Sequence, residues 1–301
     1  MGFDFKNFDD WSPYEGFAEG SGRSEKIWLQ SKDQKIGLFK FPKFDPETKI
    51  ITTEHVSEHI AHQLGVLLNV ETAEVDLGTY QGRIGCMSYL LNKPNEAIIE
   101  GAVFISGLHP DYDMDEMQEL ESGRYYCLDH LMELAIAPIM DYKWMQMMIF
   151  DFLIGNTDRH QNNWAILIKS VNDEKSELDA CPLYDNGSSL CCYISDDAAE
   201  GYLGKDKNRF EALVNSKSTS MIRIDGFLKR RPTHKEVVEY LVEKYPVARA
   251  IAKEFCKTMT PSVIHDLMGK YNGILSPIKL ELITRYLLRK RELLFEIVSG
   301  V

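Results

Sequence analysis

Two short polar runs, each flanked by apolar segments, constrain this chain more than any other feature of its sequence. They cover Asp151–Trp164 and Leu183–Leu190. In the first run Asp158 is followed five residues later by Asn163, and Asp185 of the second run comes about twenty residues further on. If these residues form one site, the fold must bring the carboxylates of Asp158 and Asp185 and the amide of Asn163 close together.

This order of side chains suits the transfer of a phosphoryl group. Such a transfer from ATP requires a carboxylate that orients the attacking hydroxyl and hard oxygen ligands that hold magnesium. Kinases meet these needs with an Asp, four residues, an Asn and a later metal-binding Asp. The alternative is that Asn-Thr-Asp and Asp-Asn-Gly are ordinary turn sequences. The presence of both triplets in this order, with a lysine and a glutamate upstream, favours a phosphoryl-transfer site over ordinary turns.

The flanking sequence indicates how the chain delivers these residues. Tyr142–Ile154 is apolar at helical spacing and predicts a buried helix that ends at Gly155. A buried strand over Trp164–Ile168, a polar turn and a second strand over Ala180–Tyr184 then lead to Asp185. Paired as a hairpin, the two strands bring the acid, the amide and the second acid together.

Composition excludes several classes of protein. The chain has 301 residues, 44% of them apolar and 27% charged, as expected of a globular protein with one large domain or two lobes. Its formal charge of −12 argues against general nucleic-acid binding. No apolar run reaches the length of a membrane helix, and the N-terminus has neither a signal-peptide nor a myristoylation pattern. We therefore expect a cytoplasmic protein without a membrane span.

The basic stretches and the cysteines do not indicate a functional site. We expect Lys229–Arg231 and Arg289–Arg291, the most basic stretches, to be solvated helix surface. Six cysteines without Cys-x-x-Cys spacing predict reduced thiols rather than disulfides or a metal site.

The N-terminal part predicts a β-rich lobe that can cover a nucleotide. Gly16–Lys26 is rich in glycine and serine and precedes two strand-like segments, Ile27–Gln30 and Ile36–Phe41. A glycine-rich segment between strands can lay its amide groups over phosphates, although it can also be a simple loop. Lys40 is either a snorkelling edge residue or the cation that grips the α- and β-phosphates, with Lys43 as its substitute.

A helix is predicted over Thr52–Leu68, with Thr53 or Thr52 as its N-cap. Glu54 and Glu58 lie four residues apart on one face, and either can pair with the strand lysine and fix its ammonium group over the phosphates. Glu58 is favoured because its apolar neighbours place it nearer the core.

The same helix carries His55, His59 and His62 on one face, a spacing that also suits zinc. No cysteine or further histidine nearby completes such a site, so we expect a solvated helix face. Beyond this helix, Glu71–Gly78 and Gln81–Leu91 predict two strands joined by a turn. The second leads to a hinge near Ser88–Asn92, where backbone groups would meet adenine.

These segments resemble the HipA-like Ser/Thr kinase family, and in plan its compact members of CtkA or HipT type, which lack an extra N-terminal subdomain. The Asn-Thr-Asp-Arg-His loop followed by Asn163 is the most specific element of the resemblance, whereas the helical tail from about Phe210 matches only in general character. The stretches that carry the resemblance are Ser24–Leu29, Leu38–Pro42, Ser57–Ala61, Phe150–His160 and Tyr184–Leu190.

The resemblance implies an α+β fold of two lobes, protein-kinase-like and related to that of phosphoinositide kinases. Residues 1–92 would form the β-rich N-lobe and residues 93–301 the mainly helical C-lobe. ATP and Mg²⁺ are the implied cofactors. The residues expected around the nucleotide are Gly20, Ser21, Gly22, Ser24, Lys26, Lys40, Ser88, Tyr89, Leu90 and His160.

The resemblance also implies roles for the remaining site residues. Asp158 would be the catalytic base, Lys40 and Glu58 the phosphate-binding pair, and Asn163 and Asp185 the metal ligands. Asn156 and His160 would support the catalytic loop rather than carry protons.

Two further properties follow from the resemblance. Asn186 stands where ordinary kinases have the Phe of Asp-Phe-Gly, so a packing switch built on that ring is not expected. Family members autophosphorylate a serine in the glycine-rich segment, for which Ser21 and Ser24 are the candidates. Phosphate there would add about −1.5 to −2 of charge where the phosphates of ATP must sit.

Several functional alternatives stay open at this stage. The same scaffold can serve a lipid or small-molecule kinase, or a nucleotide-binding pseudokinase that acts as an interaction module. HipA-like kinases are often toxins that phosphorylate translation enzymes such as aminoacyl-tRNA synthetases and have an antitoxin partner. CtkA-type members are instead secreted as effectors, here without a classical signal peptide. A protein substrate is expected in either role.

Overall fold

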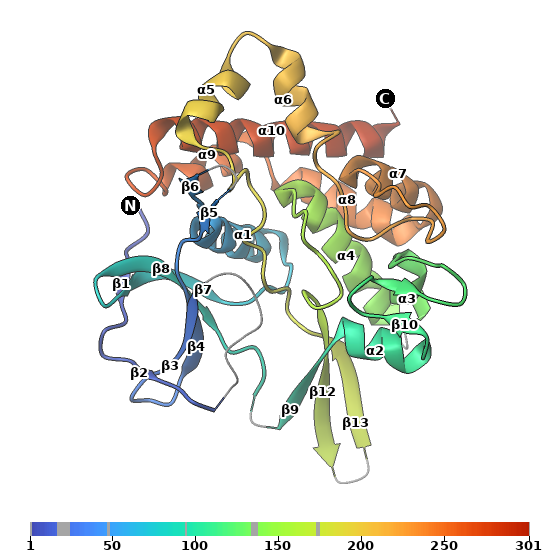
Figure 1. The fold of residues 1–301 in the computed structure, drawn as a ribbon. Helices are drawn as coiled ribbons and strands as arrows, with labels where there is room; N and C mark the ends of the chain where they lie inside the picture. The colour runs from blue at the N-terminus through green and yellow to red at the C-terminus, as the bar shows by residue number, and fades with distance from the viewer. Residues whose placement is uncertain are drawn as a thin grey trace. The chain divides into compact units, whose positions relative to one another are not determined.

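The computed structural model describes residues 2–16, 25–46, 49–93, 95–133, 138–172 and 175–300. The chain forms two compact units, each built from three separate segments (Figure 1). The first unit comprises Met1–Leu91, Asp185–Phe210 and Pro261–Leu287, and the second comprises Asn92–Tyr184, Glu211–Thr260 and Leu288–Val301. Sequence analysis predicted a single boundary, after residue 92. In the structure the first unit also includes two segments from later in the chain, Asp185–Phe210 and Pro261–Leu287.

A six-stranded sheet with the order β1-β7-β8-β4-β3-β2 forms the base of the first unit. β1 and β7 pair in parallel, and the other neighbours are antiparallel. One face of the sheet carries a core of Phe8, Leu29, Phe39, Phe41, Tyr80, Met87 and Tyr89. The strands are β1 (Lys6–Asn7), β2 (Ser12–Pro13), β3 (Lys26–Gln30), β4 (Ile36–Lys40), β7 (Val75–Tyr80) and β8 (Arg83–Tyr89).

Strand alternation separates Lys40 from this core. Successive side chains of a strand lie on opposite faces, so Phe39 enters the core while Lys40 lies on the other face. There its direct neighbours across the sheet are Lys26 and Cys86. Helix α1 (Glu54–Leu68) packs against β7 and β8.

The connections around α1 follow local sequence with one exception. Gln81 and Gly82 both have positive φ, as a two-residue hairpin turn requires, and they join β7 to β8. Asn69 ends α1 in the left-handed conformation and donates its N–H to the carbonyl of Gly65. The N-cap position is Thr53, but its side chain makes no capping hydrogen bond, so only the position of the predicted cap was right.

The histidine face of α1 is not solvated, which corrects the sequence interpretation. His59 is buried, and its Nδ1 lies 2.8 Å from the hydroxyl of Tyr271. Burial lowers the pKa of both His55 and His59 to about 4, so both rings are neutral at pH 7. The covering Tyr271 comes from a segment about 200 residues away in sequence, which no local pattern could reveal.

The remaining elements of the first unit are short except for one long helix. They are β5 (Phe44–Asp45), β6 (Ile50–Ile51), α5 (Asp196–Leu203) and α9 (Pro261–Gly269). Helices α6 (Lys207–Val214) and α10 (Pro277–Ser299) contribute residues to both units. Near the start of α10, the buried Lys279 donates to the backbone carbonyls of Cys191 and Ile194.

The second unit combines a three-stranded antiparallel sheet, of order β13-β12-β9, with helices. Helix α4 packs against α7, α8 and the strand β13, so it is the central helix of this unit. The elements are β9 (Glu96–Glu100), α2 (Gly101–Leu108), β10 (Tyr112–Asp113), β11 (Gln118–Glu119), α3 (Leu128–Glu133), α4 (Pro138–Ile154), β12 (Ala165–Asn172), β13 (Lys175–Ala180), α7 (His234–Lys244) and α8 (Pro246–Thr258).

The hairpin that precedes Asp185 forms, but its second strand is earlier than predicted. β12 and β13 pair antiparallel, as expected, yet β13 ends at Ala180 where the sequence interpretation had a strand begin. Pro182 explains the difference, because proline has no N–H to donate to a neighbouring strand. Irregular chain, rather than a strand, therefore leads to Asp185.

Two predictions about surface residues have different outcomes. Lys229–Arg231 is exposed but lies in an irregular segment before α7, and Lys290 of the Arg289–Arg291 stretch is fully buried. All six cysteines are free, in agreement with the expected reduced thiols. Among the described residues, no helix has both the length and the apolar character needed to cross a membrane.

Candidate active site

In the first unit, Lys40 contacts the carboxylates of Glu58 and Asp185, which are far apart in sequence. Its Nζ lies 2.8 Å from Asp185 Oδ1 and 3.4 Å from Glu58 Oε2. Burial alone would lower the pKa of Lys40, but the charges of Asp185 and Glu58 outweigh burial and raise it above its usual value. Lys40 is therefore a permanently charged cation between a strand, a helix and the Asp185 loop.

Lys26 supplies a second positive charge on the same face of the sheet. It sits directly opposite Lys40 in the β3–β4 pair. Burial lowers its pKa, and the neighbouring charges act in opposite directions, Asp185 raising the pKa and Lys40 lowering it. The ammonium groups of the two lysines can donate hydrogen bonds to phosphate oxygens.

Glu58, and not Glu54, is the partner of Lys40. Glu58 also accepts the backbone N–H of Asn186 through Oε1, at 2.9 Å, so one carboxylate joins α1 to both the lysine and the Asp185 loop. Glu54 instead accepts the hydroxyls of Thr52 and Tyr193. Of the two glutamates that sequence analysis considered as partners of Lys40, it is Glu58 that contacts the lysine.

The Asp185 loop is held in an unusual backbone conformation. Asp185 has a φ of 55°, in the left-handed region that costs a non-glycine residue about 1 kcal/mol. Ser189 donates its hydroxyl to the carbonyl of Asn186, at 2.6 Å. A Cβ added to Gly187 would lie 3.1 Å from Glu58 Oε2, so the loop approaches Glu58 as closely as a glycine permits.

In the second unit, the loop after α4 places Asp158 through Asn156. Gly155 leaves the helix with a φ of 67°, and the buried Asn156 then accepts the N–H of Asp158 on its Oδ1, at 3.0 Å. His160 donates its backbone N–H to the carbonyl of Asp158. Asn156 therefore contacts the loop through its side chain and His160 through its backbone N–H.

A buried ion pair between Arg159 and Asp151, which sequence analysis did not predict, holds this loop against the end of α4. Arg159 binds Asp151 at two points, Nε to Oδ2 at 3.0 Å and Nη2 to Oδ1 at 2.9 Å. Its Nη1 also donates to the carbonyls of Asn163 and Tyr184. The signal was available, because an aspartate inside an apolar helix must be buried with a partner.

Asn163 presents an oxygen whose direction is set by its own amide. Its Nδ2 donates to the carbonyl of Asp158, at 2.7 Å, so Oδ1 lies on the other side of the side chain. Asp185 offers a half-exposed carboxylate. Each of the two side chains, taken within its own unit, offers a hard oxygen donor of the kind that Mg²⁺ binds.

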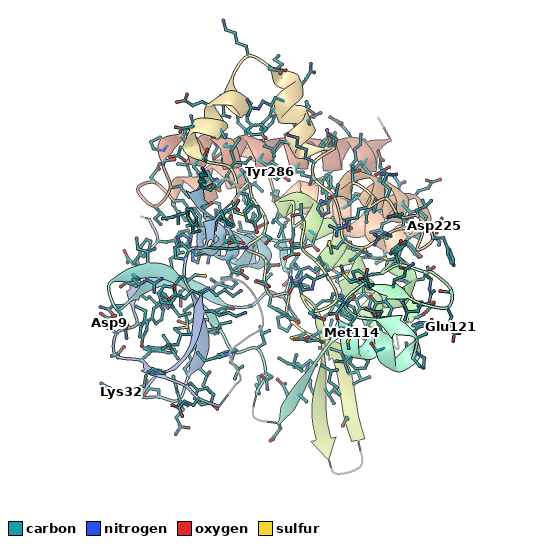
Figure 2. The ribbon with its side chains drawn as sticks, viewed as in Figure 1. Asp9, Lys32, Met114, Glu121, Asp225 and Tyr286 are labelled. Atoms are coloured by element: carbon teal, nitrogen blue, oxygen red, sulfur yellow. The ribbon has the colours of Figure 1, made fainter. Side chains whose placement is uncertain are left out.

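Gln161 ties the same loop to a neighbouring segment of the second unit. The hydroxyl of Tyr112 donates to Gln161 Oε1, and Gln161 Nε2 donates to the carbonyl of Met114 at 2.7 Å. Met114 is labelled among the side chains of Figure 2. Together with Arg159, this contact leaves the loop little freedom to rearrange.

The expected hinge residues have part of their backbone already engaged. Tyr89 donates its N–H to the carbonyl of Glu74, and Leu90 donates its N–H to that of Ile36. Ser88 pairs with Leu38 inside the sheet. The remaining predicted nucleotide contacts, Gly20, Ser21, Gly22 and Ser24, lie outside the described residues.

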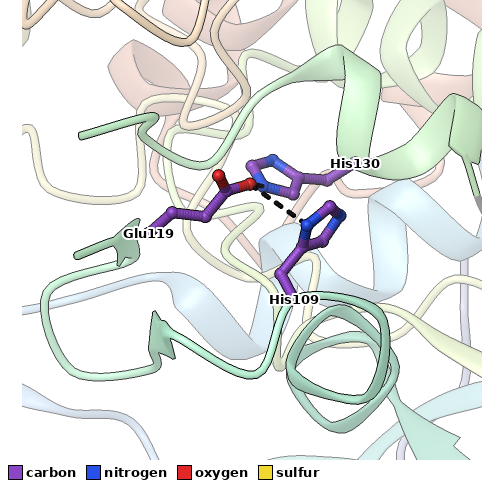
Figure 3. Close-up of side chains that lie close together, drawn as sticks. All are labelled: His109, Glu119 and His130. Atoms are coloured by element: carbon purple, nitrogen blue, oxygen red, sulfur yellow. Dashed lines mark hydrogen bonds and ion pairs between the residues drawn. The ribbon is translucent and has the colours of Figure 1, made fainter. Parts of the chain in front are cut away.

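One other cluster has the composition of a metal site, but its hydrogen bonds argue against one. Figure 3 shows the rings of His109 and His130 directed at the carboxylate of Glu119. The N–H of Cys127 donates to His130 Nδ1, so the proton of the neutral ring must be on Nε2, which faces Glu119 at 2.9 Å. Arg124 already donates to Glu119 at 2.7 Å. The cluster is a hydrogen-bond network that holds the β10–β11 segment.

Comparison with known proteins gives the fold and its relatives. No family model matches the chain. The serine/threonine-protein kinase CtkA of Helicobacter pylori strain J99 is 24% identical over 262 residues, which are 79% of this chain and 74% of CtkA.

Solved structures agree with this relationship. The crystal structure of H. pylori CtkA, described as a proinflammatory kinase, superimposes with a TM-score of 0.79 at 17% identity, over 99% of this chain and all of CtkA. HipA of Shewanella oneidensis, in complex with HipB and operator DNA, gives a TM-score of 0.62 at 15% identity, over 97% of this chain and 69% of HipA. The predicted α+β kinase-like fold is confirmed, and the chain is similar to the serine/threonine-protein kinase CtkA in sequence and to CtkA and HipA in fold.

Proposed function

We propose that this protein transfers the γ-phosphoryl group of ATP to serine or threonine hydroxyls of a protein, with Mg²⁺ as the divalent ion. The observation that carries the proposal is the contact of Lys40 with both Glu58 and Asp185. In kinases a strand lysine fixed by a helix glutamate holds the phosphates beside a metal-binding aspartate. Lys26, opposite Lys40, adds charge for the same phosphates.

The proposed role of Asp158 is to orient the acceptor hydroxyl and accept its proton. The supporting contacts are those of Asn156 to its N–H, and of Asn163 and His160 to its carbonyl. A base of this kind must be placed accurately, because small displacements of a catalytic group lose much of the rate. The Arg159–Asp151 ion pair supplies that rigidity from within the second unit.

Asn163 and Asp185 are the proposed metal ligands. When bound, Mg²⁺ would neutralise part of the charge that develops on the transferring phosphoryl group. Lys40 and Lys26 would neutralise the rest, and Glu58 would keep Lys40 in place. Each of these contributions can be removed separately by substitution.

The test is incorporation of radiolabelled phosphate from Mg-ATP by the purified protein and by added acceptors. Asp158→Ala and Asp185→Ala should lose transfer, while Asp197→Ala, which removes an exposed aspartate of α5, should retain it. Equal incorporation in all three variants would refute the assignments. Preferential labelling of a lipid or aminoglycoside would favour a small-molecule kinase. Nucleotide binding without transfer to any acceptor would favour a pseudokinase.

The acceptor that we propose is a protein of the translation machinery, such as an aminoacyl-tRNA synthetase, as for HipA-like toxins. A gene for a small helix-turn-helix protein beside this one would favour a toxin with an antitoxin partner. The proinflammatory role named for CtkA would favour a secreted effector instead. Both roles put the protein in a cytoplasm, its own or that of a host cell. Phosphoproteomics after expression of the wild type and of Asp158→Ala would identify the substrate.

A further inference from the structure

Lys279, in the first turn of α10, is a buried lysine that binds the backbone some residues after Asp185. Its Nζ donates to the carbonyl of Cys191, at 2.6 Å, and to the carbonyl of Ile194. Only 2% of the lysine is exposed, and all of these residues belong to the first unit. A lysine is seldom buried so completely without a structural or functional reason, because burial removes its amine from water.

The place of Lys279 in its helix is unfavourable apart from these two contacts. Ser276 Oγ accepts the N–H of Lys279 at 3.2 Å, which puts the lysine in the first turn of α10. The helix dipole disfavours a cation in a first turn. Burial also lowers the pKa of Lys279 and so disfavours its charged form. The two backbone carbonyls are therefore the interactions that account for a lysine at this position.

The two carbonyls are the ends of a single turn. Ile194 donates its N–H to the carbonyl of Cys191 at 3.0 Å, so the chain closes a turn over residues 191–194. Leu190 and Cys191 have φ values of 50° and 61°, a region that residues with a side chain rarely adopt. Such a backbone persists only where the surrounding contacts hold it. Lys279 supplies two of these contacts from outside the turn.

Hydrogen bonds continue from this turn to the residue beside Asp185. Cys192 donates its N–H to the carbonyl of Ser189, at 3.0 Å, and Ser189 donates its hydroxyl to the carbonyl of Asn186, at 2.6 Å. Asn186 directly follows Asp185 and donates its own N–H to Glu58. A shift of the turn would therefore displace the backbone that carries the Asp185 carboxylate.

The turn lies between two helices of the first unit. On the side of α1, the N–H of Thr53 donates to the carbonyl of Cys192 at 3.2 Å, and the hydroxyl of Tyr193 donates to Glu54 at 2.7 Å. On the side of α10, the contacts are those of Lys279. Removal of the lysine amine would leave the turn attached to α1 and take away its contacts to α10.

We propose that Lys279 is a positioning residue for Asp185, which it acts on by holding the turn over residues 191–194. This inference rests on the proposed function, because the position of Asp185 affects metal binding only if Asp185 is a ligand. Residues that orient a metal ligand without touching the metal typically change the metal affinity by about 10–100-fold when they are replaced. Lys279 has this relationship to Asp185 through the backbone.

The contact can be tested without any activity. Lys279→Met removes the donor, so the N–H groups of Cys192 and Ile194 should exchange with solvent about tenfold faster than in the wild type. The N–H groups of β7 and β8 report any loss of overall stability, and their rates should increase less. Lys32→Met, at an exposed lysine labelled in Figure 2, is the matched control and should leave the turn unchanged. Equal exchange at Cys192 and Ile194 in wild type and Lys279→Met would overturn the proposal.

The affinity for a divalent ion tests the positioning role. Mn²⁺, titrated by electron paramagnetic resonance with ADP present, should bind Lys279→Met about tenfold more weakly than the wild type. The Mg²⁺ concentration that gives half-maximal phosphate transfer should rise by a similar factor, while kcat at saturating Mg²⁺ stays within about threefold. A loss of folded protein alone would lower kcat without moving the Mg²⁺ midpoint, and that result would contradict the role.

Ser189→Ala tests the same path with a smaller change, even if Lys279→Met does not fold. It removes the hydroxyl that joins the turn to Asn186 and should also weaken Mn²⁺ binding. If both residues act along one path, the double variant should lose less affinity than the two separate factors multiplied together. Unchanged Mn²⁺ affinity in Ser189→Ala, or independent factors in the double variant, would refute this path.

These measurements separate the inference from the proposed function. If the wild type binds Mn²⁺ more tightly than Lys279→Met but transfers no phosphate, the proposed function fails and the positioning role stands. If phosphate transfer is normal and Lys279→Met equals the wild type in exchange rates and Mn²⁺ affinity, only the positioning role is wrong.

Discussion

Arg159 and Asp151 form a two-point ion pair with both side chains almost completely removed from solvent. Burial raises the pKa of Asp151, and the charge of Arg159 acts against this increase. The same guanidinium reaches two backbone carbonyls, so one side chain joins the end of α4, the loop that carries Asp158 and the residue before Asp185.

Removal of this arginine should be strongly destabilising. Arg159→Met leaves Asp151 buried without its partner, and we expect the free energy of unfolding to fall by about 3–5 kcal/mol. Urea denaturation at pH 7 measures the change. Arg230→Met is the matched control, because Arg230 makes a similar two-point pair with Glu236 at the surface, where solvent screens the charges, and its loss should change stability far less. Equal losses in the two variants would show that burial of the Arg159 pair is unimportant.

Glu58 should matter for catalysis and Glu54 should not. Glu58→Gln retains an oxygen for the N–H of Asn186 but removes the charge that holds Lys40, so we expect kcat/KM for ATP to fall by roughly tenfold or more. Glu54→Gln, one turn earlier on α1, changes contacts to Thr52 and Tyr193 only and should stay within about twofold of wild type. Steady-state kinetics at saturating acceptor distinguish the variants. A larger loss in Glu54→Gln would reverse the assignment.

Gly187 should not tolerate a side chain. In Gly187→Ala the new Cβ would be 3.1 Å from Glu58 Oε2 and 3.2 Å from the carbonyl of Glu54, so Glu58 must move. We expect reduced kinase activity and a lower melting temperature. Gly107→Ala, at a helical position where nothing lies within 4 Å of the added Cβ, should instead stabilise the protein by about 0.5–1 kcal/mol. Full activity of Gly187→Ala would mean that the Asp185 loop is more adaptable than its contacts indicate.

His59 should make the protein sensitive to acid. Its folded pKa of about 4 lies below the ordinary value of 6.5, so the unfolded chain takes up the proton first. The stability that the neutral ring contributes is complete above pH 6.5 and is lost as the pH falls toward 4. Between pH 7 and pH 5 this amounts to about 2 kcal/mol.

Urea unfolding at the two pH values in wild type and His59→Gln checks this expectation. The variant should lose about 2 kcal/mol less between pH 7 and pH 5. His265→Gln, which removes an exposed histidine of α9, is the matched control for the substitution itself. An identical pH dependence in wild type and His59→Gln would show that His59 does not titrate as its burial requires.

Local sequence was sufficient wherever backbone preference decides the structure. Gly155 ended α4, and Gln81–Gly82 formed the β7–β8 turn, because both need positive φ. The exception was β13, for which the apolar residues after Ala180 were weighted above the missing donor of Pro182. A proline inside an expected strand indicates that the strand ends before it.

The charged and titratable residues were the least predictable part. Lys290, Lys279 and the histidines of α1 have the sequence context of surface residues, but hydroxyls, carbonyls and rings from distant segments bury them. The pairing of Lys40 with Glu58 was expected from the resemblance to kinases. The Arg159–Asp151 pair lies inside the most specific motif but was not predicted, because its role is to hold the loop by buried contacts and the sequence spacing gives no sign of them.

The hydrogen bond between Lys40 Nζ and Asp185 Oδ1 links the affinity for a divalent ion to the affinity for nucleotide. A divalent ion that takes this oxygen must compete with the ammonium group, and phosphate oxygens offer the lysine a replacement. Occupation by nucleotide and by metal would then favour each other, and the factor by which each increases the affinity for the other must be the same. A dissociation constant for either ligand would therefore have a meaning only at a stated concentration of its companion.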